Sequence, residues 1–185
     1  MRILAVSGSL RESSFNTSLL RAALEAAPDG VELELWEGIG ELPLYDEDLE
    51  AGAPDSVRRL REDWAAADAI LFSTPEYNGS VPGGLKNAID WASRPPIEAV
   101  LRNKPVAVVG ASTGQFGALW AQQDLKRILG IAGARVIGTE IPVSRAHERF
   151  DSEGRLLDGE VFEQLRLHLT TLASEAVAAP DRVAA

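Results

Sequence analysis

The sequence predicts a single α/β domain of the doubly wound kind: a three-layer sandwich whose five-stranded parallel sheet has the strand order 2-1-3-4-5. Three observations support this prediction. Strand-length apolar runs alternate with amphipathic helical patterns, some of those runs are continuously apolar, and the 185-residue chain is short for the longer dinucleotide-binding order. Continuous apolar runs are typical of strands that are covered by helices on both faces.

The strands are expected at five positions along the chain. The first, third and fourth read Ile-Leu-Ala-Val, Ile-Leu-Phe and Val-Ala-Val-Val, without the alternation of a half-exposed strand. Crossovers between parallel strands are almost always right-handed, which places helices on both faces of the sheet. The expected strands are Ile3–Val6, Val31–Trp36, Ala69–Ser73, Val106–Gly110 and Arg135–Ile137.

Five amphipathic helices are expected between and after these strands, because apolar residues recur at spacings of three and four. Pro-Asp-Gly at 28–30 ends the first, Pro-Asp-Ser at 54–56 opens the second, and Pro95-Pro96 ends the third. Residues 1–177 are therefore expected to form one domain with a frayed tail over 178–185. The segments Gly38–Gly52 and Ser144–Gly159 are expected to be irregular surface excursions. The predicted apolar faces are Leu19, Leu20, Ala23, Leu24 and Ala27; Val57, Leu60, Trp64 and Ala67; Leu85, Ala88, Ile89 and Ala92; Leu125, Ile128, Leu129 and Ala132; and Val161, Phe162, Leu165, Leu169 and Leu172.

Composition excludes several classes of function. The chain has no cysteine, which rules out disulfides, thiolate metal sites and dithiol redox chemistry. A net charge of −10 argues against nucleic acid or an anionic membrane as a partner. No run is long enough to span a membrane and the apolar start is too short for a signal peptide, so a cytoplasmic protein is expected. His147 and His168 have no neighbouring ligands, so we expect surface or boundary histidines and no metal site.

Three loops follow strands whose carboxyl ends meet at one edge of the predicted sheet. In an open parallel sheet a ligand binds beyond those ends, at the point where the strand order reverses. Here that point lies between the first and third strands, with the fourth strand beside it. The loops after Val6, Ser73 and Gly110 are therefore the candidate binding loops, and each has an unusual composition.

The first loop, residues 7–16, reads Ser-Gly-Ser-Leu-Arg-Glu-Ser-Ser-Phe-Asn and precedes a helix that begins near Thr17. Hydroxyls, the Arg11 guanidinium and the start of a helix together suit a phosphate group. The loop matches neither GxxxxGK[ST] nor GxGxxG, which favours a mononucleotide over a dinucleotide. The alternative is a polar loop in which Ser14 or Asn16 only caps the helix.

The second loop, residues 74–84, reads Thr-Pro-Glu-Tyr-Asn-Gly-Ser-Val-Pro-Gly-Gly. This rigid set of turns would present backbone groups to a flat heteroaromatic ring that Tyr77 could flank. The alternative is a hairpin-like surface turn in which Tyr77 only packs. The third loop, residues 110–117, reads Gly-Ala-Ser-Thr-Gly-Gln-Phe-Gly and allows close backbone approach to a ligand. Lys86 and Asp90, on the helix after the second loop, are expected to form caps and salt bridges rather than to act in catalysis.

Motifs in these loops resemble the NADPH-dependent FMN reductase family, which includes bacterial quinone, chromate and azo-dye reductases. The resemblance extends from about Ile3 to Ile137 and implies a flavodoxin-like domain that binds FMN. Its motifs are Gly8-Ser9-Leu10-Arg11-x-x-Ser14-x-Asn16, Pro75-Glu76-Tyr77-Asn78-Gly79-Ser80-x-Pro82-Gly83-x-Leu85-Lys86-Asn87-x-Ile89-Asp90-Trp91 and Ser112-x-Gly114-x-x-Gly117. The implied phosphate ligands are Ser9, Arg11, Ser14 and Asn16. The implied neighbours of the ring are Pro75, Glu76, Tyr77, Asn78 and Gly79, with Ser112 and Gly114 on the third side.

The resemblance implies an oxidoreductase that passes electrons from NADPH or NADH through FMN to a small acceptor in a ping-pong cycle. The acceptor could be a quinone, an azo compound, a metal oxyanion or free flavin. Hydride transfer needs proximity and orientation more than an acid or a base, so no catalytic side chain is predicted. Two alternatives stay open: a flavodoxin-type electron carrier without nicotinamide turnover, and a non-redox binder of a phosphate ligand. Tyr77 is the one obvious aromatic neighbour of the ring, which leaves a ring face open and favours the enzyme.

The resemblance also implies a homodimer or homotetramer in which the helix Gly84–Trp91 packs against a second subunit. That helix has apolar residues on more than one face, with Leu85, Ala88 and Ile89 on one and Trp91 offset from them. Trp91 is therefore expected to anchor the subunit interface. The alternative is that Trp91 fills the core of the monomer.

Overall fold

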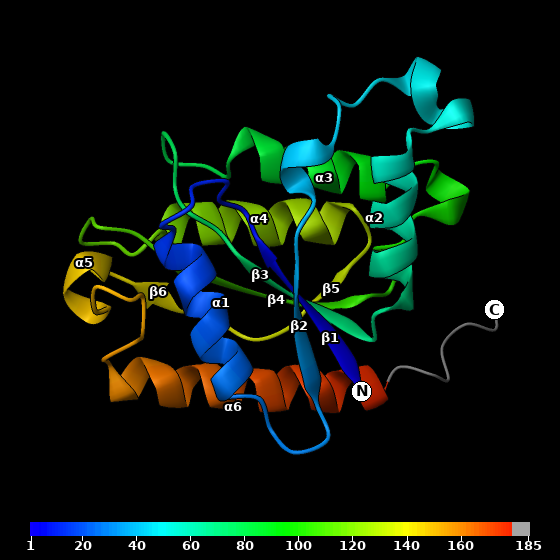
Figure 1. Cartoon of the computed structure of the whole chain (residues 1–185). Helices are drawn as coiled ribbons and strands as arrows, with labels where there is room; N and C mark the ends of the chain where they lie inside the picture. Colours follow the sequence, from blue (N-terminus) through cyan, green and yellow to red (C-terminus); the bar gives the residue numbers. More distant parts are fainter. Residues whose placement is uncertain (179–185) are drawn as a thin grey trace.

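The computed structural model describes residues 1–178, which form a parallel sheet between two layers of helices (Figure 1). The predicted strand order is confirmed as β2-β1-β3-β4-β5, the order of flavodoxin-like domains. A further short strand, β6, was not predicted and pairs with β4. The strands are β1 (Arg2–Ser7), β2 (Glu32–Trp36), β3 (Ala69–Ser73), β4 (Pro105–Ala111), β5 (Arg135–Val136) and β6 (Pro142–Val143).

The helices cover the two faces of the sheet unequally. Figure 1 shows α1 and α6 on one face and α2, α3 and α4 on the other. Short 3₁₀ turns interrupt the connections that follow β2 and α3. The helices are α1 (Phe15–Glu25), α2 (Asp55–Ala66), α3 (Gly83–Ala92), α4 (Leu119–Ile131), α5 (Ala146–Arg149) and α6 (Gly159–Val177), and the 3₁₀ turns are η1 (Ile39–Glu41), η2 (Glu47–Gly52) and η3 (Pro96–Glu98).

The continuously apolar strands are buried on both faces, as their composition indicated. Along β1, Leu4 and Val6 belong to the apolar cluster beneath α2, α3 and α4. Ile3 and Ala5, between them in the sequence, belong to the cluster beneath α1 and α6. Side chains alternate across a strand, so a strand between two helical layers needs an apolar residue at every position.

The edge beyond β4 is one strand broken into two. β5 pairs with the start of β4 and β6 with its end, and Gly138 lies in the gap between them. A Cβ atom at Gly138 would lie only 2.4 Å from Cε1 of His168 on α6, so the histidine ring occupies the space beside the gap. The expectation of a surface or boundary His168 is wrong, because the residue is only 8% exposed. Helical spacing places His168 on the same face as Leu165, Leu169 and Leu172. Because histidine is polar, the predicted apolar face did not include it.

The excursion over residues 38–52 crosses the outer side of α3 and covers it. The carbonyl oxygen of Pro43 accepts hydrogen bonds from Asn87 Nδ2 and Trp91 Nε1, each at 2.9 Å. Tyr45 packs edge-on against the Trp91 ring with the ring centroids 5.0 Å apart. Trp91 is fully buried within the monomer, so the expectation that it anchors a subunit interface is wrong. The second apolar face of α3 has a partner in its own chain.

Two further expectations concern the ends and the surroundings of the chain. The frayed tail expected over 178–185 falls almost entirely on residues 179–185, which lie outside the described residues. Within residues 1–178 no helix combines the length and apolar character needed to cross a membrane. The cytoplasmic location stays a prediction.

Candidate functional site

The loop from β1 to α1 emerges at the carboxyl edge of the sheet by passing over the end of β3. The backbone N–H of Gly8 donates to the Ser73 carbonyl oxygen at 2.8 Å. A Cβ atom at Gly8 would lie 2.8 Å from Cδ2 of Leu85, so glycine permits this close approach. The loop is thereby held between β1 and β3, at the reversal of strand order where a ligand was expected.

Ser14 and Arg11 have different roles in this loop. Ser14 Oγ accepts hydrogen bonds from the N–H groups of Asn16 and Thr17 at 3.2 and 3.4 Å, which makes Ser14 the N-cap of α1. The Arg11 side chain is exposed, and its guanidinium carbon lies 5.6 Å from the centre of the Phe15 ring. Within the described residues no carboxylate pairs with Arg11. A cation at a helix start, in a strongly acidic protein, is a favourable place for an anion.

The side chain of Asn16 joins the loop to two strands. Its Oδ1 accepts from Ser73 Oγ at 2.9 Å and from the Ala111 N–H at 3.0 Å. Its Nδ2 donates to the Ala111 carbonyl oxygen at 3.0 Å. The residue is buried, and three of its four side-chain hydrogen-bonding positions are used by the protein itself. Asn16 therefore positions the loop that carries Arg11.

The loop from β3 to α3 forms a tight hairpin at the same edge. Tyr77 and Ser80 exchange backbone hydrogen bonds of 3.1 and 3.2 Å around Asn78 and Gly79, whose φ angles are 52° and 75°. Two successive positive φ angles are typical of a type I′ turn, for which Asn-Gly is the preferred pair. Tyr77, at the base of this hairpin, is 53% exposed. The backbone thus forms the hairpin-like turn considered from the sequence, and the placement of Tyr77 beside a ring stays a prediction.

Two side chains attach this hairpin to α4. Glu76 Oε2 accepts a hydrogen bond of 3.1 Å from the Ala121 N–H in the first turn of the helix. Ser80 Oγ donates to Asp124 Oδ2 at 2.5 Å. The Ser80 hydroxyl and, after it, the Arg127 guanidinium hold the pKa of Asp124 below its usual value. Sequence reasoning did not find Asp124, because it lies outside every motif.

The loop from β4 to α4 is attached to the segment from β6 to α5. The Ser112 carbonyl oxygen accepts a hydrogen bond from the Ala146 N–H at 2.9 Å, and the Gly114 carbonyl oxygen accepts one from the Arg145 N–H at 3.0 Å. At Gly117, with φ of 57°, a Cβ atom would lie 2.5 Å from the Pro142 carbonyl carbon. The unpredicted strand β6 and the first part of the 144–159 excursion therefore support the third loop.

The three loops enclose a cavity of about 340 Å³, which is within the range of small-molecule sites. Asn78, Gly79 and Gly114 of the predicted site do not line it. The other eight predicted residues do, and Phe15, Ala111 and Thr113 complete the lining: Ser9, Arg11, Ser14, Asn16, Pro75, Glu76, Tyr77 and Ser112. A cation and hydroxyls come from the first loop, and Pro75 and Tyr77 come from the second. This donor set fits a ligand that joins an anionic group to a flat ring.

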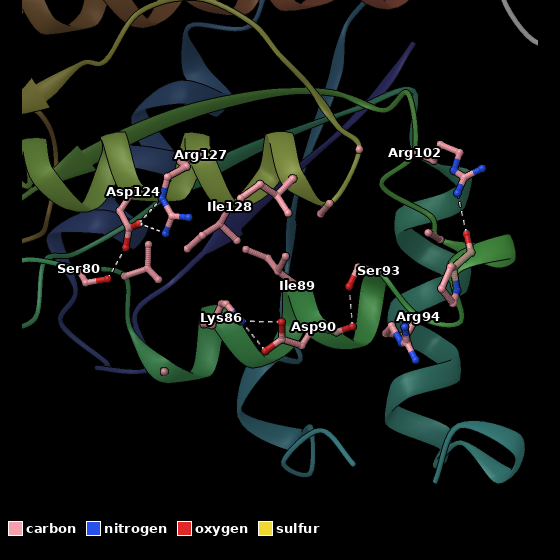
Figure 2. A pocket seen from close by; sticks show the side chains of 17 residues that line it. Ser80, Lys86, Ile89, Asp90, Ser93, Arg94, Arg102, Asp124, Arg127 and Ile128 are labelled. Carbon is pink, nitrogen blue, oxygen red and sulfur yellow. Dashed lines mark hydrogen bonds and ion pairs between the residues drawn. The ribbon is translucent and has the colours of Figure 1, made fainter. Parts of the chain in front are cut away.

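The largest cavity, of about 740 Å³, lies between α3 and α4 (Figure 2). Four of its ionic groups form two pairs: Lys86 Nζ lies 2.7 Å from Asp90, which confirms the expected salt bridge, and Arg127 lies 2.7 Å from Asp124. Arg102, which also lines the cavity, donates to the Pro96 carbonyl oxygen. Ile131 lines it and is 76% exposed. The smaller cavity instead combines hydroxyls with the Arg11 cation, which has no carboxylate partner within residues 1–178, and we place the ligand site there.

No metal centre is found in the part of the chain that the structure describes. Among residues 1–178 no three His, Asp or Glu side chains are grouped so that they could hold an ion. His147 is exposed and lies 3.6 Å from Glu148, on α5. His147 and His168 are therefore far apart in the sequence and on different helices, and neither lines the candidate cavity.

Comparison with known proteins is consistent along nearly the whole chain. Residues 1–148 match the family described as NADPH-dependent FMN reductase, and that stretch includes all three loops. An NAD(P)H-dependent FMN reductase of Pseudomonas aeruginosa is 45% identical over 174 residues, which are 93% of each chain. A quinone reductase of Escherichia coli is 39% identical and covers 92% of this chain and 90% of its own. The solved structure of FerB, a flavoenzyme NAD(P)H:(acceptor) oxidoreductase from Paracoccus denitrificans, is 36% identical, with a TM-score of 0.87 over 96% of this chain and 98% of its own.

Proposed function

The chain belongs to the NADPH-dependent FMN reductase family, and from this premise we propose that it is an NAD(P)H-dependent FMN and quinone reductase that binds FMN in the cavity between its three loops. One observation carries the assignment of the cavity. The exposed Arg11 guanidinium lines the same cavity as the second loop, although Pro75 of that loop comes 64 residues after Arg11 in the sequence. A mononucleotide with a planar ring needs both in one place.

The residues divide the binding task between them. Arg11, Ser9 and Ser14 take the phosphate, and Asn16 positions them through its hydrogen bonds to β3 and β4. Pro75, Glu76 and Tyr77 form one edge of the ring site, and Ser112 forms the opposite side. When bound, FMN supplies a group that takes two electrons from a reduced nicotinamide and gives them to an acceptor.

The protein contributes orientation and access to this chemistry rather than a catalytic acid or base. Glu76 holds the hairpin against α4, so the wall of the cavity keeps its place when reactants enter and leave. Tyr77 is half-exposed at the rim and leaves the mouth open. Donor and acceptor then occupy one mouth in turn, which is a ping-pong order. The acceptor is a small oxidised molecule such as a quinone, an azo compound, a metal oxyanion or free flavin.

The same proposal includes a homodimer or homotetramer that forms through the α3–α4 face. Figure 2 shows Lys86 and Asp90 of α3 facing the cavity opposite Asp124 and Arg127 of α4. Each helix thus carries both signs of charge, and the exposed Ile131 lies on the same cavity. In a twofold interface the same patch meets itself, and a patch of mixed charge is able to complement its own copy.

Binding and turnover are tested in sequence. Titration of the apoprotein with FMN, followed by flavin fluorescence, should show saturable binding at one site per chain. Anaerobic stopped-flow mixing with NADPH and with NADH should then bleach the bound flavin, and 1,4-naphthoquinone should restore its colour. Bleaching no faster than that of free FMN with both nucleotides would support an electron carrier. Absence of FMN binding would support a non-redox binder of a phosphate ligand.

A further inference from the structure

Exposed aromatic side chains gather at one end of the molecule. All the Phe, Tyr and Trp residues lie within the described part of the chain, and three of them are exposed. Tyr77 is 53% exposed, Phe116 47% and Trp120 48%. Tyr77 lies on the second loop, Phe116 on the third, and Trp120 on the first turn of α4. Every exposed aromatic residue therefore belongs to a loop or a helix start at the carboxyl edge of the sheet, and Tyr77 lines the candidate cavity.

Phe116 and Trp120 form a pair. Their ring centroids are 4.7 Å apart and their planes are inclined at 49°. The hydrogen bond from the Ala121 N–H to Glu76 links this pair to the hairpin, since Trp120 precedes Ala121 and Tyr77 follows Glu76. Residues 112 and 113 of the same loop line the cavity, whereas Phe116 and Trp120 lie outside its lining.

The backbone beneath the pair is strained. Ala118 has a φ of 60° and follows Gly117, whose φ is 57°. A non-glycine residue in this left-handed region costs free energy, and such strain is concentrated at functional sites. This turn closes with a 3.0 Å hydrogen bond from the Leu119 N–H to the Phe116 carbonyl oxygen. It places the Phe116 ring against Trp120 at the surface, an arrangement that brings neither ring into the core.

We propose that Phe116 and Trp120 form a stacking platform that selects neutral planar acceptors, the quinones, at the mouth of the cavity. This inference rests on the proposed function. Faces of planar rings stack on aromatic side chains irrespective of charge, whereas the net charge of −10 disfavours an anionic acceptor at the same surface. The platform therefore favours a quinone over a metal oxyanion.

The test uses the FMN-loaded enzyme in its oxidised state, which has no electrons to give, so that quinone only binds. Trp36, Trp64 and Trp91 are buried, and quenching of tryptophan fluorescence by 1,4-naphthoquinone should report mainly on Trp120. Trp120→Leu keeps an apolar side chain but removes the aromatic face. It should weaken quinone binding, measured by calorimetry, by roughly tenfold and raise the quinone KM by a similar factor. Trp120→Phe should restore most of the affinity.

Three matched measurements give the proposal its specificity. In Trp120→Leu the FMN affinity, the rate of reduction by NADPH and the KM for ferricyanide, an anion without a planar ring, should stay within twofold of the wild type. Leu167→Ala, which truncates an exposed side chain on α6 (62% exposed), should leave quinone affinity unchanged. The platform is also supported if quinone binding depends on Trp120 in an enzyme that neither nucleotide reduces, although the proposed function would then fail.

Three outcomes would overturn the platform. The first is unchanged quinone affinity in a folded, FMN-loaded Trp120→Leu enzyme. The second is an equal loss of affinity for quinone and for ferricyanide. The third is a lower molar mass of the variant in light scattering, because Trp120 lies one turn before Asp124 on α4 and would then be part of a contact between two copies of the chain.

Discussion

Among single residues, Arg11 and Asn16 show how one loop separates binding from folding. The Arg11 guanidinium has no carboxylate partner within residues 1–178 and lies over the Phe15 ring, and Arg11 lines the candidate cavity. Asn16 is buried and bonds to Ser73 and to both backbone groups of Ala111. Substitution of the first should therefore affect a ligand, and substitution of the second should affect the fold.

Arg11→Ala is expected to weaken FMN binding without changing the stability of the apoprotein. A charge-assisted contact contributes about 1.5–3 kcal/mol, and exposure of the side chain favours the lower end, so the dissociation constant should rise roughly tenfold. FMN fluorescence titration measures the change. Arg166→Ala on α6, which removes another exposed arginine, is the matched control. Equal FMN affinity in the Arg11 variant and the wild type would remove the phosphate from this loop.

Asn16→Ala is expected to destabilise the apoprotein itself. The substitution leaves Ser73 Oγ and the two backbone groups of Ala111 without their partner in a buried place. Unpaired buried groups cost about 1–3 kcal/mol each, so the free energy of unfolding should fall by roughly 3 kcal/mol in urea titration. Ser73→Ala removes one of the three bonds and should cost about 1 kcal/mol. If the Asn16 variant were as stable as the wild type but bound FMN poorly, its side chain would be a phosphate ligand.

At the scale of elements, the contact between α6 and the broken edge strand contains a buried titratable group. The His168 ring lies against Gly138, and its Nε2 has no hydrogen-bond partner among the described residues. Lys126 lies nearby, with its amino group 2.8 Å from the Gly138 carbonyl oxygen and 3.1 Å from Glu140. Burial, and then the positive charge of Lys126, lower the pKa of His168 from 6.5 to about 4. The folded chain therefore holds this histidine neutral.

Stability is expected to fall as pH falls from about 6.5 to about 4. In this window the unfolded chain binds a proton at His168 and the folded chain does not, so protonation favours unfolding. The two pKa values correspond to a loss of roughly 3 kcal/mol at full protonation. Urea titrations at pH 7 and pH 4.5 should show a smaller loss in His168→Gln than in the wild type.

The comparison between the wild type and His168→Gln separates the pH dependence that is due to the histidine from that due to the carboxylates. The pKa of Glu140 is lowered because hydrogen bonds from its own backbone N–H and from Lys126 outweigh the effect of its burial. A carboxylate of this kind loses its contribution only as pH falls through its own lowered pKa, and it is present in both chains. An identical pH dependence of the two chains would mean that His168 is exposed to solvent in solution.

For the whole molecule, α3 meets its own chain on one side and is open on another. Trp91 is buried beneath the 38–52 excursion, whereas Lys86 and Asp90 line the cavity toward α4. Ile131, at the end of α4, is among the exposed apolar residues of the same cavity. The proposed assembly and the folding of the monomer should therefore depend on different residues of this region.

Trp91→Ala is expected to change the stability of the monomer, and Ile131→Glu is expected to change the proposed assembly. Truncation of the buried tryptophan should lower the free energy of unfolding by about 3–5 kcal/mol. A charge at Ile131 should change the stability of the monomer by less than about 0.5 kcal/mol. It should shift the molar mass in light scattering toward that of a single chain, because the charge would be buried in the proposed interface. A wild type that scatters as a 19.8 kDa monomer at micromolar concentration would contradict the proposed assembly.

The strand order, the main helices and the edge of the sheet at which the candidate cavity lies followed from patterns in the sequence. Continuously apolar strands, helical spacing and the composition of three loops are local properties, and the topology of parallel sheets then brings those loops to one edge. Eight of the eleven predicted site residues line the cavity for this reason. The position of Asn78 at the exposed tip of a type I′ turn was available from the Asn-Gly pair itself.

Tertiary structure decided how each polar or ambiguous side chain is used. Asn16 bonds to a residue 95 positions later, Trp91 to one 48 positions earlier, and His168 packs on a glycine of the edge strand. Each of these contacts joins elements that are distant in sequence, and no pattern within one element records them. The hydrophobic period of a chain determines which faces are buried, but the partner of a buried polar group depends on how those faces meet.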